Sequence, residues 1–445
     1  MKKHNPILTL ALLGPALVSC LDLSPESSIS GDGVVSDIKA AEVILNGAYD
    51  AAGEFESHFL VAHNYASDNV VLYSGQAVIV PQFKAAGTSG FDPAAGGGYG
   101  DYYFGINEVN TLLRYVPGLS GNDSQKNRIL GEAYFLRALA YFDLARTYGG
   151  VPLILTPSES PSNGAGIPKS TYAETLAQVE ADLNAAVAAL DGTALTSRAR
   201  ASIWAVYALQ ARLYLYQERW AEAEQAASRV LASADFSLCP VLTDFFDNVP
   251  TAESIFSIVY SSADKSPFYT YYLASDKGGR LDYIPTPAFV LELLDPARGG
   301  ARSGLVADKG DGVYVIREYA LQDGSSPIQV LRLAEQYLIR AEARLRKATP
   351  DVDGALADLN AIRARAALAP LAADTPANLL LAVEQERRYE LAFEAHRFCD
   401  IVRTGRAGEV FGAYDPVFAN PNYWVLPFPA NAILADPDLK QNPGY

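Results

Sequence analysis

A helix that is apolar on two sides is the strongest constraint in this sequence. Within the stretch from 131 to 155, GEAYFLRALAYFDLARTYGGVPLIL, two sets of residues repeat at helical spacing on different sides: Phe135, Leu139 and Phe142, and Tyr134, Ala138, Tyr141 and Ala145. A helix with two apolar sides must be covered on both, so it has to lie inside a stack of other helices. Gly149, Gly150 and Pro152 then end the helix and prevent it from restarting.

Other segments show the same helical spacing and supply the partners for such a stack. A first helix is expected to begin with Ser36 as its N-cap, and later ones are expected at 102–116, 172–190, 200–216, 220–231, 330–346, 353–366 and 375–403. Successive helices are joined by short turns, with Ala and Tyr at the contact positions, which is typical of tetratricopeptide-type repeats. We therefore predict a mostly α fold: a tetratricopeptide-like helix-pair scaffold with long irregular loop regions and minor β-hairpins.

Three long segments lack helical spacing. Residues 55–100 are expected to form loops and short strands, residues 235–329 contain turn signals and a strand candidate at 313–319, and residues 404–445 form a tail. Loops this long in a compact protein are usually functional. We predict an N-terminal helical region at 36–234 and a C-terminal region at 235–445, which contains the irregular ligand-binding segment and the closing helices.

The N-terminus has the features of a secretory signal. Lys2 and Lys3 precede an apolar run from Ile7 to Val18, which is too short to span a bilayer stably. Residues 1–19 are therefore predicted to be a signal peptide, followed by a polar tether at 20–35. An N-terminal core helix is the alternative. After the signal, the chain has no run of about eighteen apolar residues that would span a membrane as a helix.

The charge of the chain bears on its partners. The net charge is −16, and removal of residues 1–19 takes away Lys2 and Lys3 but no acidic residue, which makes it −18. Such a charge argues against nucleic acid or another polyanion as the main partner and favours a neutral or basic ligand. Two cysteines, Cys239 and Cys399, follow Cys20. They leave one disulfide possible but exclude a disulfide framework.

The sequence gives little support for a catalytic or metal-binding site. His58 and His63 are five residues apart and do not share a helix face, and the sequence contains no Gly-x-Ser-x-Gly elbow and no P-loop. The densest group of carboxylates lies in EQERRYELAFEAHRFCDIVR (384–403), where Glu386, Glu390 and Glu394 are spaced along one helix face and alternate with arginines. We interpret it as an ion network that fixes this helix, with a general acid/base pair as the alternative. We expect no enzyme activity, no cofactor and no metal.

Aromatic residues outside the helices are the better candidates for a site. Tyr occurs 26 times and Trp only three times, and five rings gather in PFYTYYLASDKGGRLDY (267–283). Aromatic faces flanked by Asp, Asn and Arg suit ligands with apolar faces and polar edges, sugars above all. The alternative is that these rings pin the long loops to the helices.

Several stretches resemble one family. ILGEAYFLRALAYFDLARTYGGVPLIL, VLRLAEQYLIRAEARLR, ERRYELAFEAHRFCDIVRTG and the ending VLPFPANAILADPDLKQNPGY are similar to segments of the SusD/RagB nutrient-binding outer-membrane lipoproteins. The ending LVSC resembles a lipobox, in which Cys20 is acylated and becomes the first residue. Two or more acyl chains convert marginal membrane contact into stable anchoring. The matches run in order from the lipobox to the last residue, so the resemblance covers essentially the whole chain.

The resemblance implies a non-catalytic, surface-exposed lipoprotein of the outer membrane. Such a protein captures oligosaccharide, or peptide, and delivers it to a SusC-like TonB-dependent transporter. In this family the site is assembled from the loop after the first helix and from the irregular middle segment. By position, the candidate ligand-binding residues are Asp68, Asn69, Tyr73, Tyr269, Tyr271, Tyr272 and Tyr283.

The chain departs from the family in one respect. Glycan binders of the family often present tryptophans on loops, and Trp424 is the only tryptophan here that lies outside a predicted helix. The nutrient class therefore stays open. Two other functions compete with nutrient capture: a helical-toroid glycoside hydrolase or lyase that uses a carboxylate pair, and a protein-interaction scaffold without a small ligand.

Overall fold

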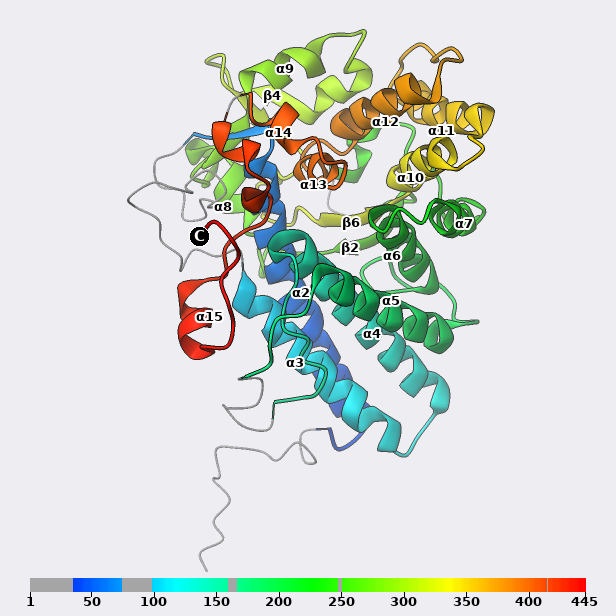
Figure 1. Cartoon of the computed structure of the whole chain (residues 1–445), viewed down its shortest axis with the longest axis vertical. Coiled ribbons are helices and arrows are strands. Elements are labelled where there is room, and N and C mark those ends of the chain that lie inside the picture. The colour runs from blue at the N-terminus through cyan, green and yellow to red at the C-terminus, as the bar shows by residue number, and fades with distance from the viewer. Residues whose placement is uncertain (1–34, 74–97, 159–165, 247–249, 414) are drawn as a thin grey trace, which may run out of the picture.

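Long helices stack around α4 (Asp123–Tyr148), which is buried along most of its length, as the sequence predicts (Figure 1). The computed structural model describes residues 35–73, 98–158, 166–246, 250–413 and 415–445. The other main helices are α2 (Ile38–Ala66), α3 (Tyr99–Tyr115), α5 (Tyr172–Leu190), α6 (Ile203–Tyr216), α7 (Trp220–Leu231), α9 (Pro287–Leu294), α10 (Leu333–Arg346), α11 (Val352–Arg365), α12 (Pro376–Glu390) and α13 (His396–Arg403). Short helices complete the set: α8 (Phe268–Tyr272), α14 (Ala407–Val410) and α15 (Ala430–Ala435). The fold is mostly α.

The helix pairs form a continuous array although the sequence separates them. Helix α6 packs on α7, α10 packs on α11, and α10 also packs directly on α7, across the insertion of residues 235–329 (Figure 1). The α6–α7–α10 contact is built from Ala211, Ala223, Ala226, Ala227 and Ala343 together with Leu215 and Ile339. Alanines at these positions allow the helix backbones to approach closely, which is the packing that the Ala-rich sequence predicts.

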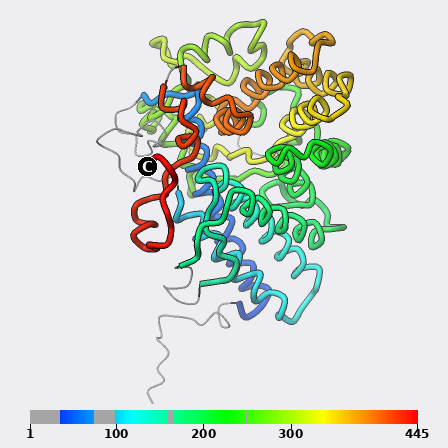
Figure 2. The backbone as a smooth tube through the Cα atoms, in the orientation of Figure 1, coloured from blue at the N-terminus to red at the C-terminus, as the bar shows by residue number. Residues whose placement is uncertain are grey.

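The C-terminal tail closes the end of α4. Gly149 follows the helix with φ 78° and ψ −130°, which glycine adopts without steric cost. The side-chain amide of Asn442 donates to the Tyr148 carbonyl (2.9 Å), and Leu426 N donates to the Thr147 carbonyl (2.7 Å). The Phe428 ring stacks on Tyr148 with a centroid distance of 5.5 Å. The tail therefore satisfies carbonyls at the end of the helix that would otherwise lack a partner, and Figure 2 shows it returning to the N-terminal helices.

Two helix boundaries differ from the prediction. Helix α2 begins after Asp37, whose carboxylate accepts from Ala40 N (2.8 Å), so Ser36 is not the N-cap. The same helix continues to Ala66, and residues 55–66 are therefore not loop. Its second half is buried on all sides, so polar residues such as Glu56 and Asn64 lie in the interior, where they hide the apolar periodicity.

The predicted helix at 375–403 is also interrupted. Helix α12 ends at Glu390, and α13 starts at His396 after Ala395, whose φ is 62°. The Asn64 side chain donates to the Phe393 carbonyl (2.6 Å) and accepts from Ala395 N (3.0 Å). These bonds from α2 hold the turn in place of a continued helix, a tertiary effect that the local sequence does not encode.

In the described part of the chain, three two-stranded antiparallel sheets cross the irregular regions. Strand β4 (Val306–Asp308) and β5 (Tyr314–Ile316), which lies within the predicted strand at 313–319, form a hairpin. The other two sheets join distant segments: β1 (Val70–Leu72) with β3 (Tyr283–Pro285), and β2 (Ser254–Ile258) with β6 (Ile328–Arg332). The β4–β5 sheet is a hairpin of the predicted kind, whereas the other two sheets are formed by long-range pairing.

Residues 1–34, which contain the predicted signal, Cys20 and nearly all of the tether, lie outside the described residues. The division at residue 235 stays a prediction. Cys239 and Cys399 are both buried and free, so they do not form the disulfide that the sequence left open. No helix within the described ranges is both long enough and apolar enough to cross a bilayer.

A buried carboxylate on α10 predicts how stability depends on pH. Glu342 accepts from Arg403 at 2.9 and 2.7 Å. Burial raises its pKa, but the charge and hydrogen bonds of Arg403, with Arg387 and Arg346, outweigh burial and lower the pKa to about 2. Because the folded-state pKa lies below the unfolded value, this group stabilises the fold above the unfolded pKa, and the contribution is lost as pH falls toward 2.

We therefore expect the difference in unfolding free energy between the native chain and Glu342→Gln to shrink as pH is lowered from about 6 to about 3. Urea denaturation at a series of pH values measures this difference. Glu409→Gln is the matched control, because Glu409 pairs with Arg406 on the surface. A difference for Glu342→Gln that stays constant across this range would contradict the prediction.

Candidate functional site

A two-stranded ribbon brings the two predicted binding segments together. Val70 pairs with Pro285, Val71 with Ile284 and Leu72 with Tyr283, in antiparallel register. The ribbon continues at both ends, since Tyr73 N donates to the Asp282 carbonyl (2.8 Å) and Thr286 N donates to the Asn69 carbonyl (2.9 Å). Segments 65–73 and 268–283 are therefore neighbours in space, although about 200 residues separate them in the chain.

The inner rings of this region form a packed cluster. Tyr283 contacts Tyr65, Tyr271 and Tyr272 at centroid distances of 5.9, 6.3 and 6.0 Å. Tyr319 packs against Tyr272 (5.4 Å) and Phe268 (4.4 Å). Tyr272 and Tyr283 are only 1% exposed. Of the predicted site residues, these two therefore hold the loop to the scaffold and present no face to a ligand in this conformation.

The outer rings are accessible. Tyr73 is 47% exposed, and Tyr269 and Tyr271 are partly exposed. The Lys265 ammonium lies 4.1 Å from the Tyr269 ring centroid, and the Arg280 guanidinium lies 5.7 Å from that of Tyr271. Rings with a charged group at one face and solvent at the other can stack on an apolar ligand face while the neighbouring cations offer hydrogen bonds.

The Tyr269 hydroxyl packs closely against Gly278. Gly278 adopts φ +95°, and a Cβ atom there would lie 2.3 Å from the hydroxyl oxygen of Tyr269. The turn can therefore approach this ring closely only with glycine at position 278.

Asp68 and Asn69 anchor the ribbon to α12 and α13. The Asp68 carboxylate accepts from Arg397 Nε (2.9 Å) and pairs with Arg388 Nη2 (3.1 Å). Burial raises the pKa of Asp68, but the Arg397 hydrogen bond and the charges of Arg397 and Arg388 outweigh it, and the pKa is lowered. Asn69 is fully buried, donates to the Ala392 carbonyl (3.0 Å) and accepts from Arg388 Nε (3.0 Å). Both side chains are thus engaged within the protein.

Comparison with known proteins identifies the family. A family model described as starch-binding and associating with the outer membrane matches residues 20–215, and the SusD family model matches residues 314–445. The chain belongs to the SusD/RagB family.

Relatives and solved structures agree with this assignment. SusD-like proteins P38 and P2 of Formosa agariphila are 27% and 26% identical, and each alignment covers all of both chains. A solved laminarin-binding SusD-like protein superposes with a TM-score of 0.77 at 24% identity, covering 92% of this chain and all of the other. A SusD superfamily protein from Bacteroides vulgatus gives 0.78 at 21% identity with the same coverage. At these identities the superpositions establish the fold.

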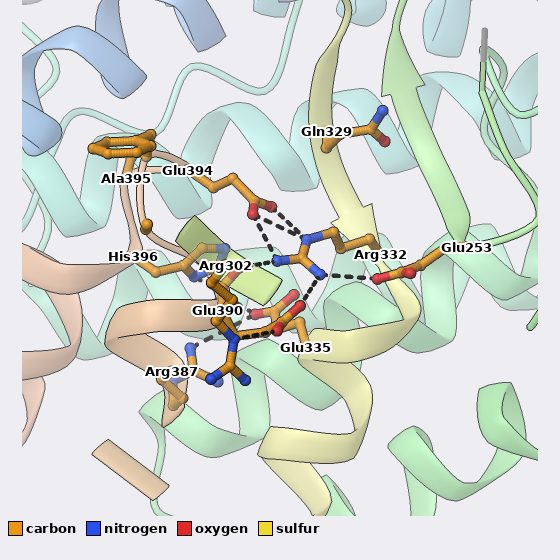
Figure 3. Close-up of polar contacts among 12 residues, drawn as sticks. Glu253, Arg302, Gln329, Arg332, Glu335, Arg387, Glu390, Glu394, Ala395 and His396 are labelled. Carbon is orange, nitrogen blue, oxygen red and sulfur yellow. Dashed lines mark hydrogen bonds and ion pairs between the residues drawn. The ribbon is translucent and has the colours of Figure 1, made fainter. Parts of the chain in front are cut away.

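The carboxylates at 386–394 of this SusD/RagB-family chain form a buried ion network (Figure 3). Arg332, the last residue of β6, donates to Glu253 (2.9 Å), Glu390 (2.8 Å) and Glu394 (2.7 Å). The predicted network is therefore confirmed, although Glu394 lies in the turn after α12 and not on the same helix face as Glu390.

A second arginine extends the network along the last turns of α12. Arg302 pairs with Glu386 (2.7 Å) and Glu390 (3.0 Å). Arg397 contacts Asp68 (2.9 Å) and Glu384 (3.3 Å), and Arg403 pairs with Asp400 (2.9 Å). The network therefore joins α12 and α13 to β6, to the turn that carries Arg302 and to the β1 loop.

The protonation of these carboxylates follows from their partners. Burial raises the pKa of Glu390, but the charges of Arg365, Arg332 and Arg302 outweigh it and lower the pKa to about 2. Burial raises the pKa of Glu394, which Arg332 only partly offsets. Glu386, Glu390 and Glu394 are all buried, and each accepts a hydrogen bond from an arginine. This arrangement favours a structural role over the alternative of an acid/base pair.

His58 and His63 both lie in helix α2. The His63 ring is buried, and burial lowers its pKa to about 3. His58 Nδ1 lies 3.4 Å from an Asp101 oxygen at the surface. In the described part of the chain, no group of three His, Cys, Asp or Glu side chains is placed to hold a metal ion.

The sequence did not reveal the arginines that support the site. Arg388 bridges Asp68, Asn69 and Glu292 (2.9 Å), and it lies over the Phe289 ring. The signal was present as two adjacent arginines in ERRYELAFE, one facing the ion network and one facing β1. Separating their roles requires knowledge of which elements lie on each side of α12.

Proposed function

We propose that this protein is a non-catalytic nutrient-binding lipoprotein that captures oligosaccharide, or alternatively peptide, and delivers it to a SusC-like TonB-dependent transporter. The observation that carries the proposal is the β1–β3 ribbon with the adjoining helix α8. Together they present Tyr73, Tyr269 and Tyr271 beside Lys265 and Arg280. Membership of the SusD/RagB family and the name of the laminarin-binding structural relative support carbohydrate as the ligand class.

The proposal includes an acyl anchor at Cys20 and a place at the cell surface on the outer membrane. The lipobox-like LVSC sequence and the match of the outer-membrane family model from residue 20 support this part. Mass spectrometry of the mature N-terminus tests it, because an unmodified cysteine at position 20 would contradict it.

A glycan and peptide array on the purified protein tests ligand capture. We expect binding of an oligosaccharide without any change in it. Turnover of the bound glycan would favour the hydrolase or lyase alternative. An array on which no glycan and no peptide binds would favour a protein-interaction scaffold and refute nutrient capture.

The exposed rings give the sharper prediction. Tyr73→Ala, Tyr269→Ala and Tyr271→Ala should each weaken oligosaccharide binding roughly two- to tenfold, because a stacked aromatic ring contributes about 0.5–1.5 kcal/mol beyond its buried area. Isothermal titration with the best array ligand measures the loss. Phe104→Ala is the matched control, since Phe104 is an exposed ring on α3. Equal affinity for all four variants would place ligand binding elsewhere on the protein.

A further inference from the structure

A polar cavity lies beside the ribbon, among the α9, α11 and α12 elements near the top of Figure 1. Its volume is about 410 Å³, within the range of small-ligand pockets. Its walls include Glu292 of α9, Arg298 after α9 and Arg363 of α11. Four residues of α12 complete them: Gln385, Glu386, Arg388 and Tyr389. Charged and amide side chains dominate these walls, in contrast to the aromatic surface of the ribbon.

Part of the hydrogen-bonding capacity of this cavity is used within the protein. One oxygen of Glu292, Oε2, accepts from Arg388 Nη1 (2.9 Å) and from the Tyr389 hydroxyl (2.8 Å). Arg363 donates through Nε to the Ala369 carbonyl (2.8 Å) and through Nη1 to Glu386. These bonds fix the walls and orient the groups that face the cavity.

The hydrogen-bonding groups of the cavity that remain without a partner include both cationic donors and an anionic acceptor. Among the described residues, Glu292 Oε1 and Arg363 Nη2 have no hydrogen-bond partner, and the nearest carboxylate to the Arg298 guanidinium is Asp295 at 3.7 Å. Two guanidinium groups therefore have donors to spare, and one carboxylate has an oxygen to spare. Guanidinium donors match carboxylate and sulfate oxygens, whereas a carboxylate oxygen accepts from a hydroxyl.

We propose that this cavity is a binding subsite for an acidic sugar residue. The oxyanion of the sugar binds Arg298 and Arg363, and a ring hydroxyl donates to Glu292 Oε1. Three arginines and two glutamates line the cavity, so its walls carry a positive excess in a chain of net charge −16. A carboxylate or a sulfate ester supplies the same oxyanion chemistry.

The cavity adjoins the candidate site through one residue. Arg388 forms part of its wall and also holds Asp68 and Asn69, which immediately precede β1. The subsite nevertheless uses none of the exposed rings, so it can bind an acidic sugar whether or not the ribbon captures a neutral glycan.

Isothermal titration of the purified protein tests this proposal with four probes: D-glucuronate, glucose 6-sulfate, D-glucose and acetate. We expect saturable binding of glucuronate or of the sulfated sugar, at least about tenfold tighter than binding of glucose or acetate. Glucose lacks the oxyanion and acetate lacks the ring hydroxyl, so neither makes both contacts. The preferred acidic probe distinguishes a carboxylate source from a sulfate source. Binding should weaken as salt is raised from about 50 to about 300 mM, because the contact is ionic.

Two variants locate the binding. Arg298→Ala removes an exposed guanidinium, and Ala297→Trp fills the cavity from an exposed position, so both should fold. Each variant should weaken binding of the acidic sugar at least about tenfold. Arg114→Ala on α3 removes the same charge from another exposed site and should leave binding of the acidic sugar unchanged. The proposal is overturned if neither acidic probe binds, if glucose binds as well as they do, or if both cavity variants match the native chain. Loss of neutral-glycan binding in the tyrosine variants with acidic binding intact would leave this proposal standing.

Discussion

Arg332→Met is expected to lower the free energy of unfolding by about 3–5 kcal/mol, because removal of one partner from a buried ion network leaves uncompensated charge in the interior. Arg332 is almost completely buried and contacts three glutamates. Arg365 still pairs with Glu253 and Glu390, so Glu394 is the carboxylate that loses its ion-pair partner. Urea denaturation measures the change.

Two further variants distinguish the energetic cost of unpaired buried charge from the cost of lost packing. Adding Glu394→Gln to Arg332→Met should recover part of the stability, because it removes the charge that the first substitution leaves unpaired. Arg219→Met serves as the surface control, since Arg219 is 36% exposed and pairs with Glu222, and it should cost less than about 1 kcal/mol. If Arg332→Met costs no more than Arg219→Met, the network does not stabilise this fold.

Gly150→Ala is expected to cost about 3 kcal/mol, at the upper end of what overpacking costs. A Cβ atom at position 150 would lie 1.8 Å from the Ser170 carbonyl oxygen, a backbone atom that cannot rotate away. Ser170 N donates to the Val151 carbonyl (3.0 Å), and Pro152 bridges to Lys169. Relief of the collision therefore requires these two segments to separate.

Thermal or urea unfolding of Gly150→Ala measures this cost, and Gly100→Ala is its matched control. Gly100 lies in α3 with no atom near the position of an added Cβ, so alanine there should leave stability unchanged or raise it by up to about 1 kcal/mol. If the two variants behave alike, the contact at Ser170 can relax and glycine is not required at position 150.

The helices with strong periodicity were predictable, and those shaped by distant contacts were not. The bounds of α5 and α7 match the predicted ranges 172–190 and 220–231, because their apolar residues recur at a regular helical spacing. In helix α2 the apolar periodicity disappears after residue 55, because the helix is surrounded on all sides there. The break after Glu390 arises from hydrogen bonds to Asn64, more than 300 residues away.

The candidate site was predictable in its segments but not in the roles of its residues. The sequence named 65–73 and 268–283, and the β1–β3 ribbon joins them. Tyr269, Tyr271, Tyr272 and Tyr283 look alike in the sequence, yet the first two are partly exposed and the last two are buried. Tyr272 is buried because it packs against Tyr319, and a run without clear periodicity does not specify which of these rings faces that contact.

The sequence by itself determined the helical scaffold, the end of α4 at Gly149 and the presence of a dense group of charges near residue 390, since apolar spacing, glycine conformation and charge are local properties. The tertiary structure alone decided which charges pair, which rings reach solvent and that a polar cavity adjoins α12. Those properties depend on contacts between residues tens to hundreds of positions apart, because burial and ion pairing are set by three-dimensional neighbours.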